Sequence, residues 1–508
     1  KFDMAVLRWY DREVSGELFD TMIAHYLIEP DLRHNMDFLA ETYLGYKPVP
    51  IEELIGPKGK NQLSMRNVSL PKIREYACED ADITLQLKEV FEPMLEETGT
   101  MKLFREIEMP LVPVLASMEA EGVKLETSAL EDFSGQLRDD IIELEKQIRQ
   151  MAGEDFNIAS PKQLGEILYE KLKVTEKPKY TRTRQYSTSE DVLMKLADSH
   201  PIINSILDYR SLTKLKSTYV DALPRLINPR DSRIHTSYNQ AVAATGRLSS
   251  NNPNLQNIPI RTERGREIRK AFVPRNEDYT LLAADYSQIE LRIIAELSED
   301  AGLIETFVQG LDVHAATASR IFGVGVEEVS PDMRRTAKTV NFGIVYGISA
   351  FGLSERLNIP RKDAADIIEQ YFDKYPGVKD YMDRTISFAR QHGYVETMMG
   401  RRRYLRDIKS ANATVRGFAE RNAINAPVQG SSADMIKIAM INIHQALKSE
   451  MLRSKMILQV HDELVFDTHR EEVEAMKKLV EEKMRTAIPM RVPVVVEINT
   501  GENWLEAH

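Results

Sequence analysis

Two aspartates in this sequence stand where apolar segments end. Asp285 closes the apolar run 279–284, and Asp462 lies in the polar turn of a hairpin predicted for 455–467. Either residue alone could be a helix cap or a salt-bridge partner, because a carboxylate beside a buried strand is costly without a cation. Together, at the tips of two strands, they could share divalent cations, since two-metal phosphoryl transfer uses carboxylates that bridge ions roughly 3.5–4 Å apart. The pair therefore predicts a phosphoryl-transfer site.

A second group of residues follows a helical spacing within 331–347. Four side chains recur every fourth position and run from cationic to aromatic: Arg334, Lys338, Phe342 and Tyr346. Residues four apart lie on one face of a helix, so the group forms a single stripe. Phosphates of a nucleoside triphosphate could lie on the cations and its sugar and base on the rings, with Gly343 and Gly347 leaving room beside them. Ordinary core packing is the alternative for the two aromatic residues.

The elements that must position these groups can be read from the apolar pattern. Residues 279–285 predict a buried strand that leads into a helix near Ile289, and Ser330-Pro331-Asp332 predicts the start of the helix 331–347. A closing strand is expected at 492–498.

The stretch from 101 to about 240 is mostly helical in pattern. Ser160-Pro161-Lys162-Gln163 and Ser187-Thr188-Ser189-Glu190 read as capping boxes, and the basic segment 174–186 between them reads as an exposed loop.

Composition bounds the class of protein. The 508 residues, 43% hydrophobic and 29% charged, predict two to four globular domains. No apolar run approaches the roughly 18–20 residues of a membrane span. Cys78 is the single cysteine, so no internal disulfide can form and a reducing, cytoplasmic location is expected. The chain starts at Lys1 inside a patterned segment, which suggests a shortened chain.

The net charge of -11 argues mildly against nucleic acid as a partner, but the basic residues cluster. One cluster, opposed by only two acids, comprises Arg401, Arg402, Arg403, Arg406, Lys409, Arg416 and Arg421. A second comprises Arg261, Arg264, Arg266, Arg269 and Lys270. Either cluster alone could be a solvated face.

Several further motifs, in order along the chain, complete the pattern. They are Thr245-Gly246-Arg247-Leu248-Ser249-Ser250, Asn254-Leu255-Gln256-Asn257-Ile258-Pro259, Asn425-Ala426-Pro427-Val428-Gln429-Gly430 and His461-Asp462-Glu463. With the Asp285 segment and the helix 331–347, they resemble family A DNA polymerases of the bacterial polymerase I type across essentially the whole chain.

The resemblance implies a mixed α/β (α+β) fold of the right-hand polymerase type. A polymerase domain would cover 101–508, with the thumb at about 130–230, the palm at about 240–315 and 410–508, and the fingers at about 316–409. The basic loop would lie at the thumb tip and grip duplex DNA, and the basic run 401–421 would serve as a track for phosphates.

The resemblance also assigns roles. Asp285, Asp462 and the Tyr286 carbonyl would hold two Mg²⁺ ions, which Mn²⁺ could replace. Arg334 and Lys338 would bind the triphosphate, with Lys338 as the general acid for pyrophosphate. The remaining nucleotide-binding positions are His314 at the β-phosphate, Phe342 on the deoxyribose, Tyr346 at the templating base, and Gln288 and Glu290. Contacts to primer or template are expected from Arg247, Asn254, Gln256, Asn257, Arg421, Asn425, Gln429 and His461.

Two of these residues bear on the choice of substrate. Glu290 would fill the space that a 2′-hydroxyl needs, which favours deoxynucleotides, although an acid in a first helical turn is also favoured by the helix dipole alone. Phe342, where some relatives carry Tyr, implies poor use of dideoxynucleotides.

Residues 1–100 resemble part of the ribonuclease H-like 3′–5′ exonuclease domain of the same family. Asp3 would belong to its second motif, and Tyr76 and Asp80 to its third, where carboxylates bridge metals and a tyrosine orients water. Asp3 and Asp80 could instead be surface acids. The first motif would precede Lys1, so we expect little exonuclease activity from this chain.

The expected partners are primer–template DNA and deoxynucleoside triphosphates, with no membrane, for a monomer that associates with the bacterial nucleoid. Two alternatives remain. A non-catalytic DNA-binding protein with a polymerase fold would be expected to lose Asp285, Asp462 or Lys338, and all three are present. An RNA polymerase or reverse transcriptase on a similar palm is opposed by Glu290 and Tyr346.

Overall fold

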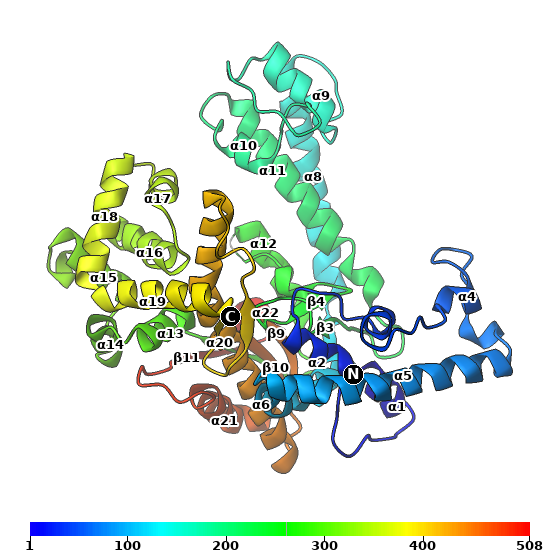
Figure 1. The fold of residues 1–508 in the computed structure, drawn as a ribbon. Helices are drawn as coiled ribbons and strands as arrows, with labels where there is room; N and C mark the ends of the chain where they lie inside the picture. Colours follow the sequence, from blue (N-terminus) through cyan, green and yellow to red (C-terminus); the bar gives the residue numbers. More distant parts are fainter. Residues whose placement is uncertain (261) are drawn as a thin grey trace. The chain divides into compact units, whose positions relative to one another are not determined.

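The computed structural model describes residues 1–260 and 262–508, so Arg261 of the second basic cluster lies outside the described residues. The chain divides into two compact units (Figure 1). Unit 1 comprises 1–121, 237–251 and 283–498, and unit 2 comprises 122–236, 252–282 and 499–508.

A four-stranded sheet with the order β11-β6-β10-β9 lies mostly in unit 1. Its strands are β6 (Tyr279–Tyr286), β9 (Lys455–Val460), β10 (Glu463–His469) and β11 (Val496–Gly501). β9 and β10 form an antiparallel hairpin, and every residue of β10 is buried. Burial on both faces, rather than an alternation, is what a strand covered by helices requires.

Four helices with many buried residues surround this sheet. They are α7 (Met109–Glu121), α13 (Ile289–Ser298), α20 (Ala413–Ser449) and α21 (Val473–Arg485). α7 packs on β9, α21 packs on β10, and α20 contacts α7, α13 and α21. α20 therefore connects most of the elements that surround the sheet.

A group of helices follows α13 along the chain and packs together (Figure 1). Its members are α14 (Ala301–Val308), α15 (Val313–Phe322), α16 (Pro331–Val345), α17 (Ala350–Leu357), α18 (Arg361–Lys374) and α19 (Pro376–His392). α15 lies against α16, so residues on these two helices can meet. Two small antiparallel hairpins complete this part of unit 1: β3 (Ser237–Asn239) with β4 (Ser249–Asn251), and β7 (Tyr394–Glu396) with β8 (Arg402–Tyr404).

The first hundred residues of unit 1 are helical. The elements are α1 (Phe2–Arg8), α2 (Thr21–Ile28), α3 (Met36–Leu39), α4 (Ile51–Ile55), α5 (Leu70–Glu97) and α6 (Met101–Leu103), with π-helical turns at Ala40–Leu44 and Phe104–Glu108. α2 packs on α5. Asp20 caps α2 by accepting hydrogen bonds from two main-chain amides of its first turn, as an N-cap aspartate does.

Unit 2 consists mainly of a pair of long helices with a separate apolar core. Its helices include α8 (Thr127–Ala152), α9 (Pro161–Gly165), α10 (Glu190–Met194), α11 (Pro201–Leu215), α12 (Glu263–Glu267) and α22 (Trp504–Ala507). α8 and α11 pack along each other, and Leu164, Leu193 and Ile206 are completely buried at their core. A three-stranded sheet has the order β2 (Arg233–Ile234), β1 (Val123–Leu125), β5 (Phe272–Val273).

Most of the predicted elements near the two aspartates are present. The strand before Asp285, the helix near Ile289, the helix 331–347 and the hairpin with its turn at His461-Asp462 are confirmed. The closing strand was expected too early, since β11 begins at Val496.

Of the two predicted capping boxes, the first is present in part and the second is absent. Ser160 does cap α9, but Gln163 accepts a hydrogen bond from the Asn157 amide instead of returning one to Ser160. The box at Ser187 is wrong, because α10 begins after Ser189. The segment 174–186 contains no helix, as predicted.

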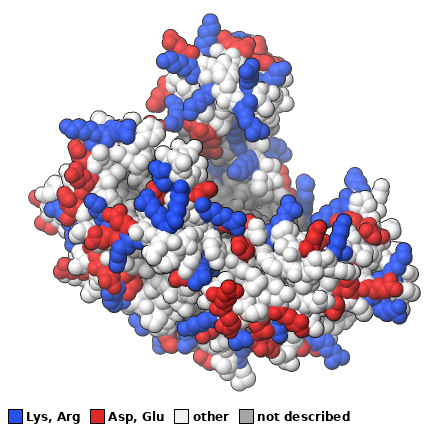
Figure 2. All heavy atoms as spheres, viewed as in Figure 1, with Lys and Arg blue, Asp and Glu red and all other residues white. Residues whose placement is uncertain are grey.

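Basic and acidic side chains are interspersed over the face shown in Figure 2. Within the described ranges, we find no helix with the length and apolar character required to cross a membrane.

Candidate active site

The main chain brings the segments of the two aspartates together. The Tyr286 amide donates a hydrogen bond to the Asp462 carbonyl oxygen (3.2 Å), because β6 and β10 are neighbours in the sheet. His461 adopts a left-handed conformation (φ 56°), which lets the hairpin turn tightly at this point. Asp285, the second-to-last residue of β6, therefore lies near the hairpin turn that carries Asp462.

The chemistry of this pair suits a hard divalent cation. Both aspartates are half-buried, and with the Tyr286 carbonyl they offer only oxygen ligands, which Mg²⁺ prefers. The Ser432 hydroxyl of α20 donates to Asp462 Oδ1 (3.1 Å) and orients that carboxylate. No group of three or more His, Cys, Asp or Glu side chains suited to a metal was found in the described part of the chain.

A buried carboxylate lies next to this pair. Glu290, in the first turn of α13, is 7% exposed and accepts a hydrogen bond from Arg247 (2.7 Å) on one oxygen and from the Tyr346 hydroxyl on the other. Burial raises the pKa of Glu290, and the negative charge of Asp462 adds to that rise, while Tyr346 and Arg247 oppose it. Glu290 and Tyr346, both on the predicted nucleotide side, therefore meet near Asp462.

The stripe on α16 is present on one face. Arg334 and Lys338 are exposed, and Phe342 and Tyr346 are half-buried, so exposure falls along the helix from the cations to the rings. Arg334 donates two hydrogen bonds to Asp312 Oδ2 (2.9 and 2.7 Å). That ion pair joins the first turns of α16 and α15.

A buried hydrogen-bond chain holds His314. Its Nδ1 lies 3.0 Å from the Asn341 amide nitrogen, and the Thr317 hydroxyl donates to the Asn341 oxygen (3.2 Å). Burial lowers the pKa of His314 to about 4, with Arg334 and Lys338 adding to the effect and Asp312 opposing it. The imidazole is therefore neutral near pH 7, accepts at Nδ1 and keeps its proton on Nε2.

The sequence suggested that Gly343 and Gly347 leave open space, and this is wrong. Gly343 lies in α16 and Gly347 just after it, and both have close neighbours. A Cβ on Gly343 would lie 3.0 Å from the Ile348 side chain, and one on Gly347 would lie 2.8 Å from Arg421. Gly347 also has a φ of +67°, which favours glycine. The glycines allow close packing, and Gly347 fits the end of α16 against α20.

Three expected DNA contacts form a second stripe, on α20. Arg421, Asn425 and Gln429 are four residues apart and none is fully buried. Within the described structure, Asn425 Oδ1 and Gln288 Oε1 are buried without a hydrogen-bond partner. Buried polar atoms normally have partners, so these two oxygens are candidate acceptors for a ligand.

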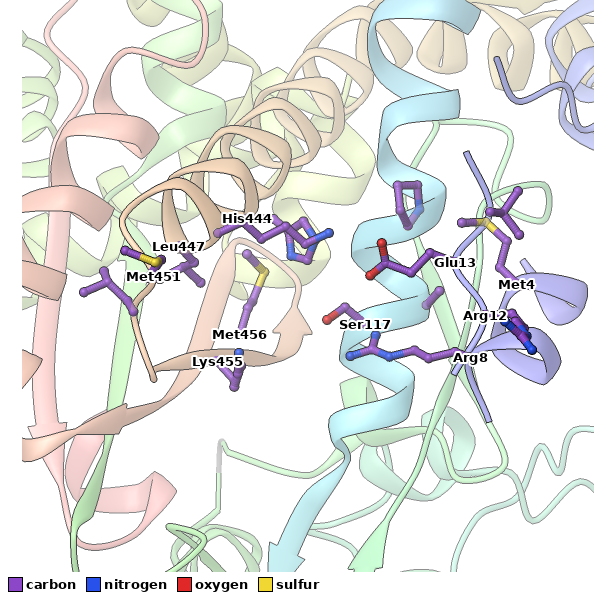
Figure 3. A pocket seen from close by; sticks show the side chains of 15 residues that line it. Met4, Arg8, Arg12, Glu13, Ser117, His444, Leu447, Met451, Lys455 and Met456 are labelled. Atoms are coloured by element: carbon purple, nitrogen blue, oxygen red, sulfur yellow. The ribbon is translucent and has the colours of Figure 1, made fainter. Parts of the chain in front are cut away.

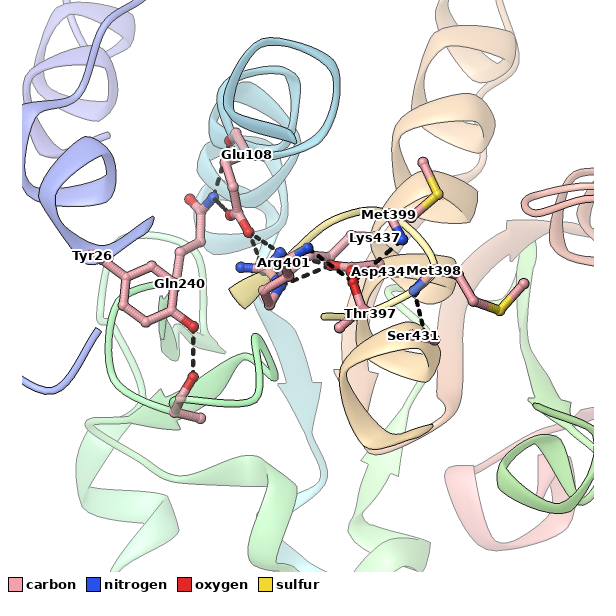
Figure 4. A network of polar contacts seen from close by, with 11 residues as sticks. Tyr26, Glu108, Gln240, Thr397, Met398, Met399, Arg401, Ser431, Asp434 and Lys437 are labelled. Atoms are coloured by element: carbon pink, nitrogen blue, oxygen red, sulfur yellow. Dashed lines mark hydrogen bonds and ion pairs between the residues drawn. The ribbon is translucent and has the colours of Figure 1, made fainter. Parts of the chain in front are cut away.

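An ionic network, which the sequence did not predict, lies beneath this region (Figure 4). Arg401 donates to Asp434 (2.9 and 2.6 Å) and to Glu108, which also accepts from Lys437 (2.7 Å) and Gln240 (2.7 Å). The four charged side chains are 3% exposed or less. Burial alone would raise the pKa of Glu108, but Lys437 and Arg401 lower it to about 2.

The network supports the segment that carries Arg247. A Cβ on Gly246 would lie 2.4 Å from Arg401 Nε, so the main chain before Arg247 packs directly on the guanidinium. In the same segment, the Ala243 carbonyl accepts a hydrogen bond from the Tyr26 hydroxyl of α2 (2.6 Å). Arg401 thus links Glu108, α20 and the Arg247 segment, and Tyr26 joins α2 to the same segment.

The interpretation of the basic run 401–421 as a phosphate track is wrong for Arg401, and for the other members it stays a prediction. Arg401 is buried, Arg403 pairs with Asp31, and Arg406 pairs with Glu29 (3.0 Å). Arg402 also has a partner, Glu396 (2.9 Å). These ion pairs lie within unit 1.

Three of the expected DNA contacts belong to unit 2. Asn254 caps a 3₁₀ turn (Leu255–Asn257) by accepting from the Gln256 amide (3.1 Å), and the Asn257 carbonyl accepts from Tyr219 (2.7 Å). These bonds fix the conformation of the Asn254–Asn257 motif.

Of the three expected exonuclease residues, the structure brings Tyr76 and Asp80 together, and their side chains interact. Asp3 is exposed on α1, whereas Tyr76 and Asp80 lie one turn apart on α5 and are half-buried. Burial raises the pKa of both Tyr76 and Asp80. Their roles stay predictions.

Sequence comparison identifies two families along the chain. The profile of DNA polymerase family A matches residues 127–506, and a 3′–5′ exonuclease profile matches residues 1–96. DNA polymerase I of Pseudomonas aeruginosa is 48% identical over 513 residues, covering 100% of this chain and 56% of the relative. DNA polymerase I of Geobacillus stearothermophilus is 46% identical, covering 99% of this chain and 57% of the relative. The chain thus spans about half the length of these curated relatives.

A solved structure is also similar over the whole chain. It is described as the POL domain of Pol1 from M. smegmatis in complex with DNA primer-template and dNTP, and it is 41% identical with a TM-score of 0.90. The similarity covers 99% of this chain and 84% of that one.

Proposed function

The chain belongs to DNA polymerase family A, and from that premise we propose that it catalyses template-directed DNA synthesis. It would add deoxynucleoside monophosphates to a primer 3′-hydroxyl and release pyrophosphate, in DNA replication and repair. The observation that carries the proposal is the hydrogen bond from the Tyr286 amide to the Asp462 carbonyl, which supports a shared role for Asp285 and Asp462.

Primer–template DNA and a deoxynucleoside triphosphate would be the substrates. The M. smegmatis protein was solved with both, and 41% identity over nearly the whole chain supports the same ligands here.

Family A DNA polymerases use divalent metal ions. We assign two Mg²⁺ ions to the Asp285 and Asp462 carboxylates with the Tyr286 carbonyl, with Mn²⁺ as a possible substitute. When bound, the ions would lower the pKa of the 3′-hydroxyl and stabilise the negative charge that develops on the phosphates.

The chain's own residues would bind and orient the triphosphate. Arg334 and Lys338 are exposed cations on one helix face, suited to phosphate oxygens. Lys338 would give its proton to the leaving pyrophosphate. The neutral His314, whose Nδ1 is paired with Asn341, would donate from Nε2 to the β-phosphate. Because the His314 imidazole carries no charge, its hydrogen bond would mainly orient the phosphate and would add little electrostatic attraction.

The sugar and base would be selected by groups at the other end of the stripe. Phe342 would pack on the deoxyribose, and Glu290 would occupy the volume of a 2′-hydroxyl. Tyr346 would stand at the templating base, and the buried Gln288 oxygen would accept a hydrogen bond from the nucleotide. Primer and template would be held by Arg247, Asn254, Gln256, Asn257, Arg421, Asn425, Gln429 and His461.

The test is primer extension with Asp285→Asn and Asp462→Asn. Each substitution removes a charge that holds cations while preserving side-chain volume, so Mg²⁺-dependent extension should fall by about 10³-fold or more. Asp363→Asn, on the exposed face of α18, is the control and should extend the primer as the parent does.

Primer–template binding by the same variants separates lost chemistry from a lost fold. Retained binding with lost synthesis supports the proposal. Synthesis by either aspartate variant at the parent rate would refute it. A parent chain that binds DNA but extends no primer would instead favour a non-catalytic DNA-binding protein.

A further inference from the structure

A cavity in unit 1 shares no residue with the candidate active site. It has a volume of about 440 Å³ and lies between α1 with the following segment 9–14, α7, the C-terminal end of α20 and the start of β9 (Figure 3). This volume falls within the range of small-molecule sites, roughly 300–1,000 Å³.

Cationic side chains surround the cavity. Arg8 and Arg12 contribute from the first segment, and Lys448 and Lys455 from the end of α20 and the start of β9. Among the described residues, none of these four side chains has a hydrogen bond or ion pair with another residue. Glu13 is the one carboxylate in the lining, so the cavity has a formal excess of three positive charges.

His444 shows that these charges act at a common point. It lines the cavity from α20, and Figure 3 shows its ring and Glu13 on opposite sides of the opening. Burial lowers the pKa of His444 to about 4, and Lys448, Arg8 and Lys455 each lower it further. Three cations from three elements are thus close enough to disfavour one more positive charge, and a bound anion would relieve their repulsion.

Apolar side chains also line the cavity. Leu447, Met451 and Met456 contribute from the end of α20 and the start of β9, and Met4 contributes from α1 (Figure 3). Methionine side chains are flexible and make favourable contacts with aromatic rings. A ligand with both a charged and a ring-bearing part would therefore use both the cations and the apolar side chains of the cavity.

We propose that this cavity binds an organic polyphosphate that carries an aromatic ring, of which a nucleoside diphosphate is the simplest example. The phosphates would lie among Arg8, Arg12, Lys448 and Lys455, and the ring would lie on the methionines. A single phosphate monoester carries about −1.5 to −2 charge at pH 7, so two phosphates are needed to match the excess of three.

The test is calorimetric titration of the whole chain with ADP in EDTA, without DNA. Lys448→Gln/Lys455→Gln should weaken ADP binding by at least about tenfold, because hydrogen bonds to charged groups are lost. Lys58→Gln/Lys60→Gln removes the same charge from an exposed loop and should leave the affinity unchanged. Equal affinity in the parent and the cavity variant, or equal loss in both double variants, would overturn the proposal.

Two further arms locate the ligand. Lys338→Ala should bind ADP as the parent does, and loss of binding in this variant alone would assign the ADP to the candidate active site and overturn the proposal. Inorganic pyrophosphate should bind more weakly than ADP, since it has no ring to contact the apolar side chains. Equal affinities for ADP and pyrophosphate would show that the aromatic ring of the proposed ligand does not contribute to binding.

Photolabelling with 8-azido-ADP gives a readout that does not depend on affinity. The labelled peptides should come from residues 444–456, 4–14 or 113–117. Labelling confined to α16 would contradict the assignment.

Discussion

The Tyr346 hydroxyl donates a hydrogen bond to the Glu290 carboxylate and so ties the end of α16 to the first turn of α13. Arg247 binds the other oxygen of the same carboxylate (2.7 Å). A buried carboxylate with both oxygens bonded has a fixed position. The Glu290 side chain is therefore held in one position and is not a mobile surface acid.

Glu290→Ala should raise ribonucleotide incorporation relative to deoxynucleotide incorporation by roughly 10–200-fold, because it opens the space that a 2′-hydroxyl needs. Single-nucleotide extension with each sugar measures the ratio of kcat/KM values. Glu290→Gln keeps the volume and is the matched control, which should retain most of the discrimination. Unchanged discrimination in Glu290→Ala would show that another group excludes ribonucleotides.

Phe342→Tyr should improve the use of dideoxynucleotides by about tenfold or more, because the added hydroxyl can bond to a charged phosphate or the sugar. Phe342 is half-buried, with its ring centroid 5.7 Å from that of His314. Competition between dideoxynucleotide and deoxynucleotide substrates measures the effect. Phe351→Tyr, at a phenylalanine that is 61% exposed, should change nothing. A flat response at Phe342 would argue against its contact with the sugar.

Arg401→Met should destabilise the surroundings of α20 by about 3–5 kcal/mol, because it leaves the carboxylates of Glu108 and Asp434 buried without their shared cation. Hydrogen exchange of the peptides covering 430–440 measures this loss locally. Arg403→Met removes a partly exposed ion pair of the same segment and should cost about 0–1 kcal/mol. Equal effects of the two substitutions would mean that the buried network adds no stability.

The first hundred residues should lose stability as the pH falls from about 6.5 towards 4. Burial lowers the pKa of His25 to about 4, with a smaller effect of His34, so the folded state binds fewer protons than the unfolded state in this range. Stability then falls by about 1.4 kcal/mol per pH unit for one such histidine. Hydrogen exchange of α2, corrected for intrinsic rates, measures the slope.

His25→Gln should reduce the pH dependence of stability by an amount that corresponds to at most one proton. This expectation does not depend on how the substitution changes stability at neutral pH. His392→Gln, in α19, is the control for a general effect of removing a histidine. If the slope in His25→Gln equals that of the parent, another group titrates.

The sequence alone determined the elements that carry the candidate site. Apolar runs predicted the strand before Asp285 and the hairpin around Asp462, and a four-residue spacing predicted the stripe on α16, because these patterns are local. The resemblance then supplied the family. A strand boundary such as that of β11 was less well defined, since its start depends on pairing with β6.

Only the tertiary structure decided which polar groups meet. Ser432 at Asp462, Asn341 at His314 and the Glu108–Arg401–Asp434 network join residues distant in sequence, and such pairs leave no periodic pattern. In the sequence, Arg401 is one of several clustered cations that could be solvated. In the structure it is buried with two carboxylates and is part of the core. The sequence suggested open space beside Gly347, but Arg421 of α20 packs against this glycine. The space beside a glycine depends on the residues that pack against it, and the sequence does not show which residues these are.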